Sequence, residues 1–89
     1  MNNQRRKEIK NIINELYDLK EKLETLKNDL ESVCQEEDDC YNNLPESIMY
    51  SERGDTMQQA IDAMDSAFDD LDTAYDSLGD CITNLEEIE

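Results

Sequence analysis

Six aspartates in the second half of the chain recur at the spacing of one face of an α-helix. They are Asp62, Asp65, Asp69, Asp72, Asp76 and Asp80, and they follow one another at intervals of three or four residues. Such intervals place side chains in one row along a helix, with neighbours about 5–6 Å apart. That separation is close to the spacing of successive phosphates on a nucleic-acid strand. The pattern therefore predicts a rigid row of carboxylates, which we call the aspartate ridge.

The charge of the ridge is not balanced by nearby basic residues. The chain holds 24 Asp and Glu against 8 Lys and Arg, for a net charge of −16, and no basic residue follows Arg53. A solvated helix usually gains stability from Lys placed four residues from an acid, whereas like charges at that spacing repel. Every acid between Gly54 and Asn84 is also Asp, a poorer helix former than Glu. We expect either a surface that binds a basic partner or a solvated face that aids solubility.

A second acidic group lies just before the middle of the chain and consists of Glu36, Glu37, Asp38 and Asp39. We expect these residues to contribute to the same partner-binding surface as the ridge. Carboxylates at a phosphate-like spacing predict binding to the basic cleft of a nucleic-acid-binding protein. Direct binding to DNA, RNA or an anionic membrane is disfavoured by the net charge of −16.

Residue types that support catalysis or cofactor binding are scarce. The chain has no His and only 2 Gly, so it lacks the commonest general base and cannot form a glycine-rich phosphate loop. Its cysteines, Cys34, Cys40 and Cys81, match no metal-binding spacing, and we expect reduced thiols. Acid–base work by paired carboxylates needs a pocket that separates their pKa values. We therefore expect no enzyme, no cofactor and no metal site.

Hydrophobic residues in the first half follow a heptad, the seven-residue repeat whose positions are lettered a to g. The a positions hold Ile9, Leu16, Leu23 and Leu30, and the d positions hold Ile12, Leu19, Leu26 and Val33. This unbroken series predicts a helix over about residues 4–37 with one apolar stripe. The heptad fails at Glu37, and acids near a helix C-terminus oppose the helix dipole. We therefore expect the helix to end there.

The second half predicts a connection over about residues 38–51 and a helix over about residues 52–88. A turn is expected at residues 43–45, and Ser51 is the expected N-cap of the second helix. Each heptad of that helix offers a large, a small and a second large residue. The large a residues are Met57, Met64, Leu71, Leu78 and Leu85, the small d residues are Ala60, Ala67, Ala74 and Cys81, and the second large residues are Ile61, Phe68, Tyr75 and Ile82. We expect Cys81 in the core, and the small residues should let another backbone approach closely.

Two helices of similar length and a short connection predict one all-α domain over residues 1–89, an antiparallel two-helix hairpin of the coiled-coil type. Such a hairpin buries little, and the stripe of its second helix is wider than one partner can cover. We expect a homodimer in the form of a four-helix bundle, or docking onto another protein. The chain has no secretory signal and no apolar run of about 20 residues, which favours a cytoplasmic protein.

Three stretches carry a resemblance to a known group of proteins: the basic opening at residues 2–16, the acidic stretch before the turn, and YNNLPESIMYSER at residues 41–53. The chain resembles a family of short acidic proteins encoded by bacterial phages and prophages, whose turn reads like N-x-P-E-N-L-x-x-S-E-R. The residues that fit are Asn43, Pro45, Glu46, Ser51, Glu52 and Arg53. Gly54 departs from the aromatic residue expected there. The resemblance implies phage origin but no binding or catalytic residues.

Two hypotheses of function follow. Small acidic phage proteins include inhibitors that mimic DNA, so the first is an anti-CRISPR-like inhibitor of a host nucleic-acid-binding enzyme of defence or repair, acting in the bacterial cytoplasm through the ridge and residues 36–39. The second is a non-enzymatic, self-associating structural or adaptor protein whose acids serve only solubility.

Overall fold

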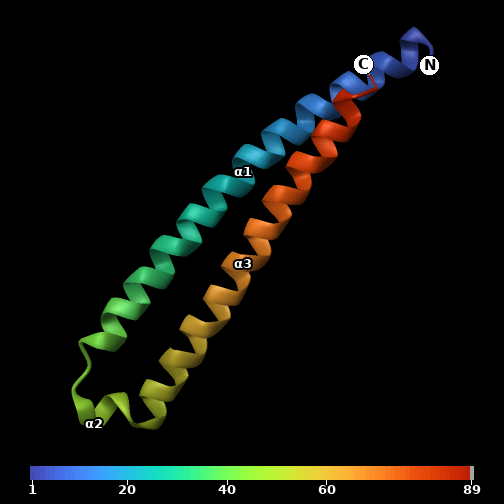
Figure 1. Cartoon of the computed structure of the whole chain (residues 1–89). Helices are drawn as coiled ribbons and strands as arrows, with labels where there is room; N and C mark the ends of the chain where they lie inside the picture. The colour runs from blue at the N-terminus through green and yellow to red at the C-terminus, as the bar shows by residue number, and fades with distance from the viewer. Residues whose placement is uncertain (89) are drawn as a thin grey trace.

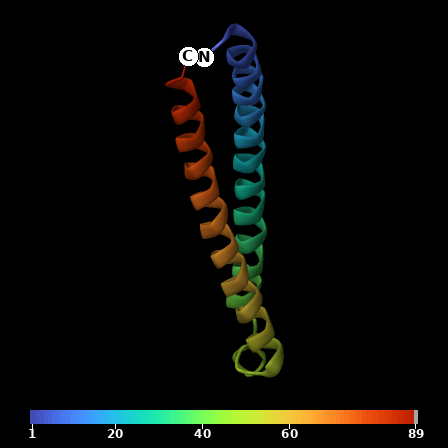
Figure 2. The same ribbon diagram turned by 90° about the vertical axis from the view of Figure 1, so that its right-hand side faces the viewer.

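The chain folds into two long antiparallel helices joined at one end by a short third helix (Figures 1 and 2). The structure is a computed structural model that describes residues 1–88. Helix α1 spans Asn3–Asn42, α2 spans Glu46–Met49 and α3 spans Glu52–Glu86. The Cα atoms fill a rod of 68 × 14 × 14 Å. The prediction of an all-α helical hairpin is confirmed, and no strand occurs in residues 1–88.

Helix α1 is longer than the sequence predicted, because the acidic stretch after Val33 stays helical. Asn2 caps its start, where Oδ1 accepts the Arg5 backbone N–H at 2.8 Å. The expected end near Glu37 is wrong, since the helix continues to Asn42. Glu37 and Tyr41 are half-buried, so the packing against α3 extends past the expected end. Each exposed acid near a helix C-terminus costs about 0.3–1 kcal/mol, and salt screens that cost. Packing of two further turns offsets it.

The connection packs closely against the start of α3. Ser51 is the N-cap of α3, as predicted, although its hydroxyl donates to the carbonyl of Ile48 instead of accepting a bond from the helix. Gly54 is buried two residues into the helix. A Cβ atom at Gly54 would lie 1.9 Å from the carbonyl oxygen of Met49, at the end of α2. Only glycine therefore fits where α2 crosses α3.

The two long helices meet through heptad positions a and e, where e is the residue four after a. In α1, Ile13 is buried and Leu16, Lys20, Leu23 and Lys27 are half-buried. In α3 the same positions hold the a residues from Met57 to Leu85 and the second large residues Ile61, Phe68, Tyr75 and Ile82, and all of these are buried or half-buried. Turning the second large residue inward buries more apolar area than turning in an alanine.

The d positions predicted for the core are exposed on both helices. We call Ile12, Leu19, Leu26 and Val33 the large row, and their exposed fractions are 48%, 50%, 49% and 52%. We call Ala60, Ala67, Ala74 and Cys81 the small row, and all four are exposed. The prediction of a core built on a and d in α1, with Cys81 buried, is therefore wrong for the d half. One neighbour covers only part of a stripe this wide.

The isolated hairpin has a very small core. Among residues 1–88 the buried apolar side chains are Ile13, Ile61 and Ile82. Within the same residues, no helix combines the length and the apolar character needed to cross a bilayer. Chains of this size normally bury about 60% or more of the surface that they expose when unfolded.

Candidate functional site: the acidic face

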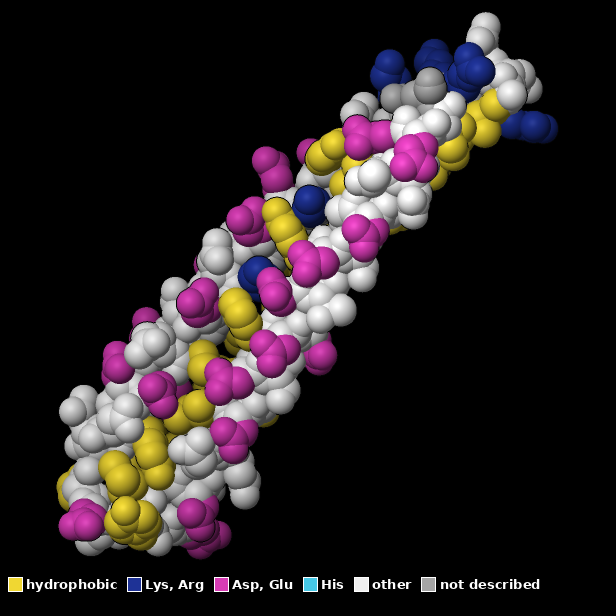
Figure 3. Space-filling model, in the orientation of Figure 1, with side chains coloured by type: hydrophobic (Ala, Val, Ile, Leu, Met, Phe, Trp, Pro, Cys, Tyr) yellow, Lys and Arg dark blue, Asp and Glu magenta, His cyan; other side chains and the backbone are white. Residues whose placement is uncertain are grey.

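The aspartate ridge lies along α3 with all six carboxylates exposed. Two contacts bring acids of α1 onto the same face: the Tyr75 hydroxyl donates to Glu24 at 3.5 Å, and Glu31 and Asp38 line a groove with Asp65. Figure 3 views this face and shows acidic side chains along both helices, with hydrophobic and basic side chains between them. We call the ridge together with Glu24, Glu31 and Asp38 the acidic face.

One ridge carboxylate is neutralised within the chain. The ammonium group of Lys27 lies 2.5 Å from Asp72, and this is the one ion pair among residues 1–88. The Lys27 side chain is 17% exposed, and its charge lies 5.4 Å and 5.3 Å from the ring centres of Phe68 and Tyr75. The hydrogen bond to Asp72 raises the pKa of Lys27 above its usual value. Lys27 is therefore held in the contact between the helices as a cation.

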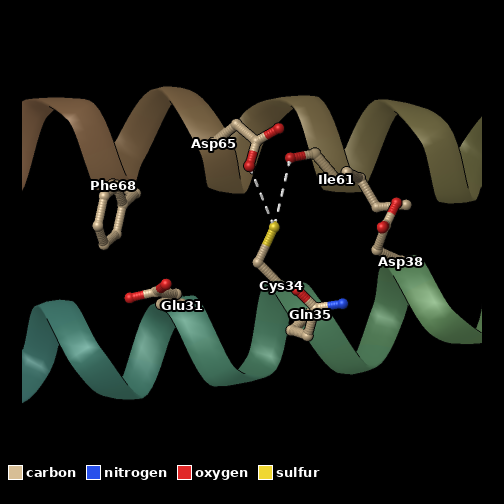
Figure 4. A pocket seen from close by; sticks show the side chains of 7 residues that line it. All are labelled: Glu31, Cys34, Gln35, Asp38, Ile61, Asp65 and Phe68. Carbon is tan, nitrogen blue, oxygen red and sulfur yellow. Dashed lines mark hydrogen bonds between the residues drawn. The ribbon is translucent and has the colours of Figure 1, made fainter.

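A second ridge carboxylate is engaged by a thiol. Cys34 lies in a groove of about 290 Å³ between α1 and α3, with its Sγ 3.3 Å from Asp65 Oδ1 and 4.0 Å from the carbonyl oxygen of Ile61 (Figure 4). The hydrogen bond to Asp65, burial, and the negative charges of Asp65 and Asp38 together raise the pKa of the thiol. Since the thiolate is the reactive form, this environment makes Cys34 a poor nucleophile and a poor metal ligand.

The four acids at residues 36–39 do not form one surface. Successive residues of a helix point about 100° apart, so the four side chains spread around α1. Glu37 lies half-buried beside α3, and Asp38 lines the groove on the acidic face. Glu36 and Asp39 are exposed, and Asp39 accepts a hydrogen bond from Gln35 at 3.1 Å. Of this group, the structure thus brings only Asp38 to the ridge.

Comparison with protein families, with curated proteins and with solved structures finds no match to the chain. Within residues 1–88 no three Asp, Glu, His or Cys side chains converge as a metal site would require. The acidic face presents exposed carboxylates along one helix, an arrangement that suits attraction and orientation of a positively charged partner.

Sequence reasoning missed the contribution of α1 to this face. Glu24 and Glu31 are seven residues apart, and Asp38 follows at the same interval. The three therefore share one heptad position, which is a visible signal in the sequence. This signal alone does not place the three residues beside the ridge, because they would lie on another face if the two helices met through positions a and d.

Proposed function

We propose that the chain is a phage- or prophage-encoded inhibitor whose acidic face binds the basic nucleic-acid-binding cleft of a host defence or repair enzyme. It would act in the bacterial cytoplasm without catalysis, by occupying the cleft in place of nucleic acid. The observation that supports this best is the exposure of all six ridge carboxylates on one continuous helix. A solvated face would not need an unbroken row of like charges that repel one another.

The electrostatics of the face also favour this function. Asp69 and Asp80 form no ion pair among residues 1–88, whereas Asp72 is paired with Lys27 and the charge of Asp76 also contributes to the raised pKa of Lys27. Carboxylates without an internal partner keep their full field for an external one. Association driven by such a field is fast and weakens steeply with salt.

The test reverses charges that the fold does not use. Asp69→Lys with Asp80→Lys leaves the Lys27–Asp72 pair intact, and the matched control, Asp18→Lys with Glu21→Lys, makes the same change in net charge on exposed positions of α1. The immobilised chain is exposed to a bacterial lysate at low and moderate salt. We expect it to retain nucleic-acid enzymes that duplex DNA elutes, and the ridge variant, but not the control, to lose them.

Retention of the same enzymes by the ridge variant would refute the ridge as the binding surface. Inhibition is then measured on each retained enzyme with its nucleic-acid substrate. An inhibitor of this kind should become weaker as the nucleic-acid concentration rises, because the two compete for one cleft.

A second candidate function is self-association as a structural or adaptor protein. It is favoured by the exposed large row, because about half of each of these apolar side chains faces water in the single hairpin. In this case the ridge variant would keep its oligomeric state. The two functions are compatible, since a homodimer in the form of a four-helix bundle would carry two acidic faces.

A further inference from the structure

The large row and the small row lie on the same face of the hairpin, opposite the acidic face. On the acidic side, e residues of the two helices contact each other: the Lys20 ammonium lies 4.6 Å from the Tyr75 ring centre, and Lys27 lies 5.4 Å from that of Phe68. In each helix the d position lies on the other side of a from e. The d rows of both helices must therefore lie together on the opposite face, which we call the d face.

The d face of α3 is nearly free of charge. Its d and g positions between Met57 and Leu85 hold Ala60, Ala63, Ala67, Asp70, Ala74, Ser77, Cys81 and Asn84. Asp70 is the one charged side chain in this set, whereas the ridge on the other side of the same helix holds six carboxylates. A helix acidic only for solubility has no reason to keep one face neutral.

We propose that the d face binds the d face of a second copy, with the two-fold axis parallel to the helices and α1 of each copy against α3 of the other. The inference rests on the self-association proposed above and specifies its partner and geometry. The rows cover three heptads, about 32 Å, and two helices are about 20 Å wide. The two copies would thus bury about 1,300 Å² in total, within the range of specific interfaces.

The shape of the two rows determines this orientation. The contacts of Lys20 with Tyr75 and of Cys34 with Ile61 fix the register of the hairpin. In that register each large residue lies within about two residues, or about 3 Å along the axis, of one small residue: Ile12 of Cys81, Leu19 of Ala74, Leu26 of Ala67, and Val33 of Ala60. A two-fold axis parallel to the helices keeps this register and places the large row of one copy over the small row of the other. An axis across the helices would stack large on large and small on small, which packs poorly.

The experiment measures the mass of the full chain by sedimentation equilibrium as its concentration is lowered. The variants are Leu26→Glu and Ala67→Glu in the two rows, with Ser66→Glu as a matched control for an added carboxylate outside the d face. We expect a dimer for the native chain, and association weaker by about tenfold or more for each row variant, because the interface would bury two unpaired carboxylates. The control should not weaken association.

A disulfide trap tests the orientation independently. In a chain with Cys34, Cys40 and Cys81 replaced by Ser, Leu26→Cys and Ala67→Cys are made separately, mixed and oxidised. We expect a disulfide mainly between the two different variants. A monomer at all concentrations, row variants that associate as tightly as the native chain, or a predominant disulfide between two Leu26→Cys chains would each overturn the proposal. Because these readouts are mass and cross-linking, failure here leaves the proposed inhibition by the acidic face to be decided by its own test.

Discussion

The two glycines of the chain give opposite predictions for the same substitution. Both lie inside α3, so replacing either by alanine should favour the helix by about 1 kcal/mol. They differ in what the added Cβ atom would meet. At Gly79 it would lie 3.3 Å from the Nζ atom of Lys20, the end of a flexible side chain that can turn away. At Gly54 it would lie 1.9 Å from the backbone oxygen of Met49.

The magnitude at Gly54 follows from that contact. Ordinary van der Waals contact begins at 3.4 Å, so α2 has to move by about 1.5 Å, because the oxygen belongs to the backbone. Overpacking of this kind costs typically 1–3 kcal/mol, and a backbone obstacle belongs at the upper end. Subtracting the helix gain of about 1 kcal/mol leaves a net loss of about 2 kcal/mol for Gly54→Ala.

Thermal unfolding followed by circular dichroism at one protein concentration checks both values. A change of 1 kcal/mol shifts the Tm of a domain of this size by about 4–8 °C. We expect Gly79→Ala to raise the Tm by about 4–8 °C and Gly54→Ala to lower the Tm by about twice that shift. A Gly54→Ala variant as stable as Gly79→Ala would refute the close approach of α2 to α3. Amide exchange in α2 then distinguishes a shifted α2 from a detached one.

Two further predictions concern the titration of single groups. In a chain whose other two cysteines are replaced by serine, Asp65→Asn should lower the raised pKa of Cys34 and so speed alkylation of Cys34 by iodoacetamide at pH 8. An unchanged alkylation rate would contradict the hydrogen bond between Cys34 and Asp65. The Tyr17 hydroxyl donates a hydrogen bond to Glu86 at 3.1 Å, and this bond raises the pKa of Tyr17 above its usual value of 10.0. The bond therefore contributes fully to stability below pH 10, and this contribution is lost as the pH rises through the pKa of Tyr17 in the folded chain. The Tm of the native chain should therefore fall more steeply above pH 10 than that of Tyr17→Phe, and Glu86→Gln should lower the pKa of Tyr17 measured by ultraviolet absorbance.

The sequence predicted the two long helices because their heptads are unbroken, but it did not predict which apolar positions meet. Ile12 at d and Ile13 at e are neighbours on one stripe, yet Ile12 is 48% exposed and Ile13 is 5% exposed. Periodicity locates a stripe and does not say how much of it one neighbour covers. The rotation of α1 is set by α3, where Phe68 and Tyr75 bury more area than Ala67 and Ala74 would.

Local rules failed where tertiary contacts outweighed them. Acids before a helix end suggested that α1 stops near Glu37, but Tyr41 continues the contact with α3 and the helix continues with it. Glycine is a poor helix former, but Gly54 is the residue in α3 that lets α2 pack closely. In both cases the sequence signal was worth about 1 kcal/mol, and contacts distant in sequence were worth more.

The ridge itself was visible from spacing alone, because one helix places residues three and four apart in a row whatever surrounds it. The pairing of Asp72 with Lys27 and of Asp65 with Cys34 was not visible, since both join residues more than thirty positions apart in the chain. Such pairs depend on the register of the hairpin. Register in turn depends on which positions form the contact, the step that periodicity left open.

The distribution of charge around α3 indicates two roles for its surface, binding of a basic partner and self-association, which the net charge alone does not distinguish. Acids added only for solubility would be placed on every exposed face, and the d face is exposed in the single hairpin. Seven aspartates lie between Gly54 and Asn84 after Asp55, and six of them lie in the ridge while Asp70 alone lies at the edge of the d face. The α3 side of this face is nearly neutral, is lined with small side chains and lies beside a row of large ones, which are properties of a surface that is covered in the assembled protein. In the proposed dimer the two acidic faces point outward on opposite sides of the bundle. Self-association would then not compete with binding of a basic partner, and one dimer could bind two.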